Sequence, residues 1–248
     1  MATSNNLDTH WRRIYQLGGG AALGAVLISA LEILITFLPG GNTTQETALD
    51  WLRLFQQNWF LGLRNLGLLN IFFISLGILT YFALYAAHRD TPYRPYAALV
   101  ASVSFIGIGV FLATNRAFPM LALSQQYTAA TTDAQRAMLE TAAQAMLVVG
   151  ASHTPGTFLG FFLSESAGIL ISCVMLRSGI FSKVAALAGL LGFTMLLIFE
   201  ITSSFVVGLS AVAMGLAMLG GISSMIWYIL VARTLFRLAR QPVVSTQD

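Results

Sequence analysis

Five ionisable side chains lie inside long apolar stretches of this sequence: Glu32, Arg64, Arg116, Glu165 and Glu200. A charge at bilayer depth is costly, so residues of this kind usually face a protein interior and find partners there. When the apolar stretches are oriented as described below, all five residues fall in the outer half of the membrane or near its middle. The sequence therefore predicts one buried polar cluster, which is the first candidate for a functional site.

Three further polar residues extend the predicted cluster. Arg64, Gly67 and Asn70 follow one another at three-residue spacing, which places them on one side of a helix. Asn115 directly precedes Arg116, and His153 lies at the outer end of the fourth apolar stretch. We predict a site for a small polar or ionic ligand that enters from outside, formed by Glu32, Arg64, Asn70, Asn115, Arg116, His153, Glu165 and Glu200.

The charges of the predicted cluster do not balance. If all three carboxylates and both guanidinium groups were ionised, one surplus negative charge would remain in a site of low dielectric constant. Of the three carboxyls, Glu165 lies deepest, near the middle of the membrane. We therefore expect Glu165 to hold or share a proton at neutral pH, because burial disfavours the ionised form.

Three other roles for these residues stay open. The Arg and Glu side chains could pair only to hold the helices in register, or the chain could be an accessory or scaffold subunit of a larger membrane complex. A membrane-embedded enzyme that uses a glutamate as acid or base is a more distant alternative. The sequence has no paired-histidine zinc motif, phosphate-binding Gly-Lys-Ser loop or nucleophile elbow, so we predict no catalytic residue, metal site or cofactor.

The composition indicates the class of protein that positions these residues. Of the 248 residues, 56% are apolar and only 9% are charged, whereas about a quarter of the residues of a soluble domain carry charge. Apolar stretches long enough to cross a hydrocarbon core recur along the whole chain. We predict an all-α, single-domain bundle of six transmembrane helices over residues 1–248, with spans at about 15–38, 59–86, 96–118, 156–176, 183–205 and 209–232.

The basic residues of the short loops predict the orientation of the bundle. One side holds nine of them: Arg12, Arg13, Arg89, Arg94, Arg177, Lys183, Arg233, Arg237 and Arg240. The other side holds only Arg53 and Arg136, each among acidic neighbours. The positive-inside rule then places both termini in the cytoplasm. The net charge of +3 follows from this topology and is no indication of nucleic-acid binding.

Two outer loops and one helix carry additional patterns. Thr43–Gln57 and Thr131–Val149 are amphipathic, with a helix start predicted at Thr132, and could lie in the membrane plane or fold over the bundle as a lid. In the fourth span small residues recur every four positions, which lets a neighbouring backbone approach closely. These residues are Gly156, Gly160, Ser164, Gly168 and Ser172.

One segment resembles a known family. The run from Arg177 to Lys183 (RSGIFSK), followed by Ala188-Gly189-Leu190-Leu191-Gly192, is similar to a segment of the DUF4386 family of uncharacterised bacterial integral membrane proteins. The resemblance implies six spans, a tight basic loop between the fourth and fifth spans, and a bacterial-type plasma membrane, but no activity. As partners we expect the lipid bilayer, a small-molecule ligand, and a membrane protein or a second copy of the chain.

Overall fold

The structure is a computed structural model that describes residues 2–37 and 45–241, with side chains described from residue 9 onward. Within these residues every regular element is an α-helix. In chain order they are α1 (Ala2–Phe37), α2 (Ala48–Gln57), α3 (Trp59–Asn65), α4 (Leu68–His88), α5 (Arg94–Thr114), α6 (Ala117–Ala129), α7 (Asp133–Gly150), α8 (Phe158–Ser178), α9 (Lys183–Phe205) and α10 (Ser210–Arg240).

Six segments of the described chain are long and apolar enough to cross a membrane. They are Thr9–Thr36, Leu68–His88, Arg94–Ala129, Phe158–Ser178, Lys183–Phe205 and Ser210–Arg240. The predicted all-α bundle of six transmembrane helices is therefore confirmed, and the chain is a multi-pass membrane protein. The fifth span has the predicted bounds, and the fourth begins and ends within two residues of them.

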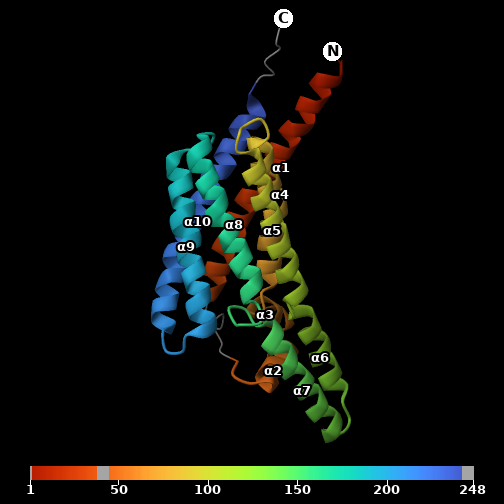
Figure 1. Cartoon of the computed structure of the whole chain (residues 1–248). Helices are drawn as coiled ribbons and strands as arrows, with labels where there is room; N and C mark the ends of the chain where they lie inside the picture. Colours follow the sequence, from red (N-terminus) through yellow and green to blue (C-terminus); the bar gives the residue numbers. More distant parts are fainter. Residues whose placement is uncertain (1, 38–44, 242–248) are drawn as a thin grey trace, which may run out of the picture.

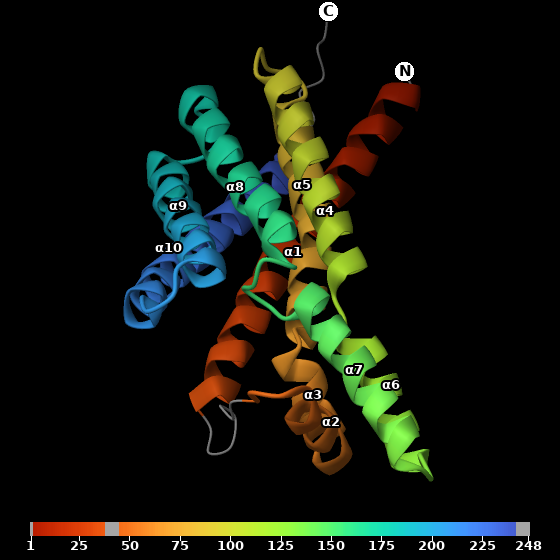
Figure 2. The same ribbon diagram turned by 60° about the horizontal axis from the view of Figure 1, so that its bottom comes forward.

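The six long helices form a closed ring whose order is the order of the chain. α1 packs against α4, α4 against α5, α5 against α8, α8 against α9 and α9 against α10, and α10 returns to α1 (Figures 1 and 2). Each helix therefore has two main neighbours. This arrangement gives the bundle a central space, which five of the helices line.

The predicted second and third spans differ from the observed ones. The apolar run 59–86 is interrupted at Gly67, which has a positive φ of 88° and separates the short α3 from α4. The third span was predicted to end at residue 118, but α5 ends at Thr114 and α6 continues to Ala129. Arg116 thus lies in the break between α5 and α6, and Arg64 lies in the last turn of α3, just before the break at Gly67. The predicted stop of the first span at Leu38-Pro39-Gly40-Gly41 lies outside the described residues.

The first and last helices are longer than their predicted spans. α1 begins at Ala2, ahead of the predicted residue 15, and α10 continues to Arg240, past the predicted residue 232. Hydropathy marks where the apolar run stops, but arginine is a good helix former and the helix continues through it. An Arg12 Nη2 atom donates to the carbonyl oxygen of Gln241 at 2.7 Å. The start of α1 and the end of α10 therefore lie at the same end of the bundle (Figure 1).

A smaller group of helices lies at the opposite end. Both predicted amphipathic segments form helices, α2 and α7, and each begins with a capping box, at Thr47 and Thr132 respectively. Leu52 and Phe55 of α2 pack with Met120 of α6 in a separate apolar cluster. The α6–α7 hairpin extends past the ends of the neighbouring helices (Figures 1 and 2).

Four residues of the predicted small-residue stripe lie on α8 and pack against two helices, whereas Gly156 lies in the loop before α8, against Val148 of α7. A Cβ at Gly160 would lie 3.1 Å from the Phe111 backbone of α5, and one at Gly168 would lie 2.3 Å from the Phe193 ring of α9. A four-residue spacing drifts slowly around a helix of 3.6 residues per turn. The N-terminal part of the stripe on α8 therefore meets α5 and the C-terminal part meets α9.

Candidate functional site

Two breaks in the helices meet a third irregular segment at one level of the bundle. Asn115, in the break between α5 and α6, donates through Nδ2 to the Leu66 carbonyl oxygen at 2.9 Å, and its Oδ1 accepts from the Ala117 amide at 3.0 Å. A Cβ at Gly67 would lie 3.3 Å from both Asn115 Nδ2 and the Ser152 hydroxyl. The Asn115 side chain thus satisfies backbone groups that the broken helices leave open. Irregular backbone at membrane depth is tolerated where protein surrounds it or where it lines a cavity.

Arg116 belongs to the same layer. Its guanidinium donates to the carbonyl oxygens of Ala113 at 2.6 Å and Asn115 at 3.2 Å. Its aliphatic stem lies against Gly150 of α7, where an added Cβ would approach the Arg116 side chain to 2.3 Å. Among the described residues no carboxylate pairs with Arg116. This arginine therefore stabilises the end of α5 and is not joined to the predicted acidic residues.

Arg64 ties α3 to α1. One of its Nη atoms lies 2.8 Å from a Glu32 carboxylate oxygen and also donates to the Glu32 carbonyl oxygen at 3.2 Å and to the Thr36 hydroxyl. The other Nη atom donates to Asn65 Oδ1 at 3.0 Å. The Arg64 side chain is only 6% exposed, whereas that of Glu32 is 37% exposed. Because the planar guanidinium of Arg64 binds several groups at once, it fixes the position of α3 relative to α1.

His153 pairs with Glu200. The His153 Nδ1 atom lies 2.7 Å from Oε2 of Glu200, whose other oxygen accepts from the Ser204 hydroxyl at 3.4 Å. Glu200 is fully buried in α9, and His153 sits in the loop before α8 with a positive φ of 58°. A non-glycine residue in this backbone region is held there by its surroundings. The imidazole stacks on Phe161, with ring centroids 4.8 Å apart.

Glu165 faces a cavity at the centre of the ring. The cavity has a volume of about 90 Å³ and is lined by residues of α4, α5, α8, α9 and α10. Its polar lining comprises Glu165, Asn70, Ser104, Ser164, Ser224, Tyr81 and Tyr228. The Oε2 atom of Glu165 is buried, and within the described chain no group donates a hydrogen bond to it. Native proteins rarely leave such an atom without a partner, so we expect this oxygen to bind a ligand, a proton or a water molecule.

Phe161 connects the cavity to the His153–Glu200 pair. One part of its side chain lines the cavity beside Glu165, and its ring also stacks on the imidazole of His153. The two polar sites are therefore separated by one aromatic side chain. A movement of the His153 loop would act directly on the wall of the cavity.

The eight predicted site residues form several groups. The structure joins Glu32 to Arg64 and His153 to Glu200, and it places Asn70 and Glu165 in one cavity. Asn115 and Arg116 bind backbone groups at the breaks. In the described residues no group of three His, Cys, Asp or Glu side chains could hold a metal ion.

Several residues of the cavity were missed from the sequence. Tyr81, Ser104, Ser224 and Tyr228 lie in apolar stretches and carry hydroxyl groups, which are common in membrane helices and give no distinct signal. Ser224 follows Gly220 on one face of α10, and a Cβ at Gly220 would come within 3.0 Å of backbone atoms of α9. That spacing could have marked the face of α10 that points into the bundle.

No protein-family model, curated protein or solved structure matches the chain. The class of the protein, a multi-pass α-helical membrane protein, therefore rests on its six apolar helices and their packing.

Proposed function

We propose that this membrane protein binds, and moves across part of the bilayer, a small polar or ionic ligand in the central cavity around Glu165. The observation that carries the proposal is the buried Glu165 Oε2 atom, which has no hydrogen-bond donor among the described residues and lines that cavity. An intramembrane carboxyl on a cavity wall is typical of ion and proton pathways. The proposed site contains fewer residues than the predicted cluster, because Glu32, Arg64, Arg116 and Glu200 bind other protein groups.

The size and lining of the cavity limit the ligand. A volume of about 90 Å³ has room for a few water molecules or one small ligand. Glu165 and Asn70 supply oxygen acceptors, and the serine and tyrosine hydroxyls can accept as well. These groups suit a small cation or a compact hydrogen-bond donor of ammonium size. A proton on Glu165 would complete the site in the absence of such a ligand.

The broken helices support the same proposal. Transporters form their sites from discontinuous helices near the middle of the membrane. Here the α3–α4 and α5–α6 breaks lie beside the His153 loop, which reaches the cavity through Phe161. We further propose that this end faces outward, because the nine basic loop residues lie at the other end. We also propose that the chain belongs to the DUF4386 family and lies in a bacterial-type plasma membrane, on the resemblance of residues 177–192.

The test uses the fluorescence of Trp227, whose ring packs edge-on against Phe193 on the cavity wall with centroids 5.0 Å apart. The purified full chain in lipid nanodiscs is titrated with sodium, methylammonium and guanidinium chloride, and a Trp227→Phe variant supplies the background from other tryptophans. We expect a saturable change with at least one of these cations. The change should be lost in Glu165→Gln.

Glu32→Gln is the matched control for this experiment. It removes one carboxylate from the same bundle, but from the Arg64 pair instead of the cavity. The control should respond to the cation as the unaltered chain does. A response of Glu165→Gln equal to that of the unaltered chain, or no response to any of the three cations, would contradict the proposal.

The accessory-subunit role has one observation in its favour. The α6–α7 hairpin projects from the bundle (Figure 2), and along α7 Met138 and Val148 are each 66% exposed. The exposed apolar side chains of α7 form a surface that a second membrane protein could cover. If this role holds, Met138→Ser with Val148→Ser should release a co-purifying polypeptide from the native membrane, and Glu165→Gln should not.

A further inference from the structure

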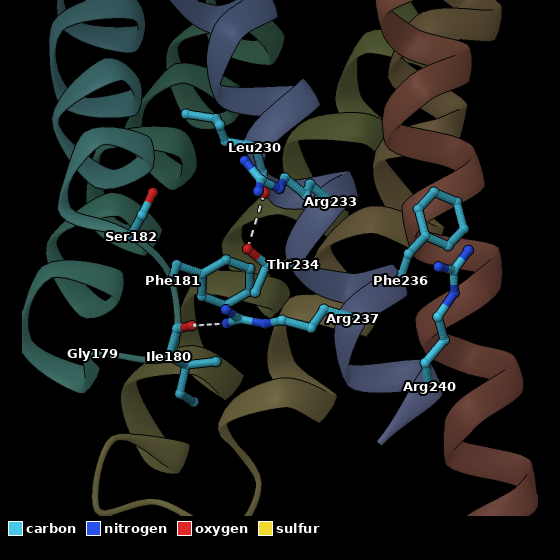
Figure 3. A pocket seen from close by; sticks show the side chains of 10 residues that line it. All are labelled: Gly179, Ile180, Phe181, Ser182, Leu230, Arg233, Thr234, Phe236, Arg237 and Arg240. Carbon is cyan, nitrogen blue, oxygen red and sulfur yellow. Dashed lines mark hydrogen bonds between the residues drawn. The ribbon is translucent and has the colours of Figure 1, made fainter. Parts of the chain in front are cut away.

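A basic hollow lies at the end of the bundle where α1 begins and α10 ends (Figure 3). We use this name for the space lined by the α8–α9 loop, including Ile180 and Ser182, and by the last turns of α10, including Arg233, Arg237 and Arg240. The hollow has a volume of about 740 Å³, within the usual range for small-molecule sites. It shares no lining residue with the Glu165 cavity and does not depend on the function proposed for that cavity.

The three arginines line the hollow because of their spacing, and Arg240 lies beside Phe236, pointing away from the α8–α9 loop (Figure 3). Positions 233, 237 and 240 are four and three residues apart, so they share one face of α10. Arg237 donates to the Ile180 carbonyl oxygen at 3.3 Å, and Figure 3 shows it pointing toward the α8–α9 loop. Arg233 and Arg240 have no hydrogen-bond or ion-pair partner among the described residues, and no carboxylate lines the hollow. Three like charges on one face repel one another unless an anion neutralises them.

The α8–α9 loop adds to the preference for an anion. Ser182 caps α9, since its hydroxyl accepts from the Ala185 amide at 3.1 Å, and the positive end of the α9 dipole therefore lies at the hollow. Gly179 ends α8 with a positive φ of 70°, which turns the chain sharply toward this position. The hollow thus combines arginine side chains with the N-terminus of a 23-residue helix.

The remaining walls are apolar. Ile180, Phe181, Leu230 and Phe236 line the hollow beside the arginines (Figure 3). A free phosphate ion gains no binding energy from apolar walls, whereas a phospholipid carries an anionic phosphate next to acyl chains that can pack against them. The hollow also lies where an apolar helix passes into a basic turn, which is the level of lipid headgroups.

We propose that the basic hollow binds the headgroup of an anionic phospholipid, with its phosphate between Arg233 and Arg237 and the start of its acyl chains against Leu230 and Phe236. Arginine forms paired hydrogen bonds to phosphate oxygens through its planar fork. The bound lipid neutralises the charge of α10 and fills the space between α10 and the α8–α9 loop. Arg240, beside Phe236, adds to the attraction at the rim of the hollow.

The experiment titrates the detergent-solubilised full chain with short-chain lipids below their micelle concentration. Dioctanoyl phosphatidylglycerol should bind saturably, and dioctanoyl phosphatidylcholine, which has no net charge, should bind far more weakly. Glycerol phosphate, a soluble phosphate ester without acyl chains and with at least as much negative charge, should also bind far more weakly. Arg233→Gln with Arg237→Gln should weaken phosphatidylglycerol binding roughly thirtyfold, at about fivefold for each arginine.

Arg13→Gln with Arg94→Gln is the matched control. Both arginines are exposed, lie at the same end of the molecule and line no part of the hollow, so this pair removes the same charge. The control should bind phosphatidylglycerol within about twofold of the unaltered chain. Equal loss in both pairs would overturn the proposal in favour of diffuse attraction to a basic surface. Glycerol phosphate binding as tightly as the lipid would overturn it in favour of a site for a soluble phosphate.

Discussion

The Nδ1 atom of His153 lies 2.7 Å from the Oε2 atom of Glu200, and this contact joins the loop before α8 to the C-terminal part of α9. Glu200 is buried, so the imidazole is its main polar partner, and the hydroxyl of Ser204 is a more distant one. Phe161 and Phe199 flank the imidazole, with ring centroids 4.8 and 4.7 Å away. The pair therefore fixes a loop that contacts the wall of the Glu165 cavity.

Replacement of His153 by phenylalanine should destabilise the protein by about 1–3 kcal/mol. Phenylalanine keeps a flat ring between Phe161 and Phe199 but leaves the buried carboxyl of Glu200 without its partner. The double variant His153→Phe with Glu200→Met should recover most of that loss, because it removes both polar groups together. Thermal unfolding in nanodiscs measures both. A double variant less stable than His153→Phe alone would show that the pair is not coupled as described.

The six spans could be predicted because long apolar runs are a strong signal. The bounds of α9 and the start of α7 at its Thr132 cap follow from local residues alone. The break at Gly67 could not be predicted in the same way. A glycine in an apolar run is equally compatible with close helix packing, and Asn115 and Ser152, which lie beside Gly67, come from distant parts of the chain.

The grouping of the charges could not be predicted for a related reason. Sequence places a residue at a depth and on a face of its helix, but the partner depends on which helices are neighbours in the ring. Arg64 of α3 reaches Glu32 near the end of α1, although α2 lies between these helices in the chain, and α9 packs on α8, which brings Glu200 to the His153 loop. Among the described residues no arginine forms an ion pair with Glu165. It is therefore the carboxyl left in the cavity.

Gly67→Ala should destabilise the protein by more than the strain of its backbone alone. An L-residue at a φ of 88° costs about 1–2 kcal/mol, and the new Cβ would also lie 3.3 Å from Asn115 Nδ2. Gly208→Ala is the matched control, because Gly208 has a φ of 87° with open space around it. Thermal unfolding of both variants separates the two effects. Equal losses would mean that the layer between the helix breaks can shift to admit a methyl group.

Thr47→Val should raise the pKa of Asp50 toward its ordinary value. In the capping box of α2 the Thr47 hydroxyl and backbone amide donate to the Asp50 carboxylate at 2.7 and 3.0 Å, and these bonds lower the pKa of that carboxyl. The charged form of Asp50 therefore stabilises the cap at neutral pH, and this stabilisation is lost as pH falls through the lowered pKa. A carboxyl titration by NMR measures the shift. Thr132→Val is the control, because it removes the matching cap of α7, in which Gln135 takes the place of Asp50 and does not titrate. Thr132→Val should therefore speed amide hydrogen exchange at the start of α7 by the same factor at every pH. The corresponding effect of Thr47→Val at the start of α2 should disappear at the low pH where Asp50 is protonated. An unchanged Asp50 pKa in Thr47→Val would contradict this account of the cap.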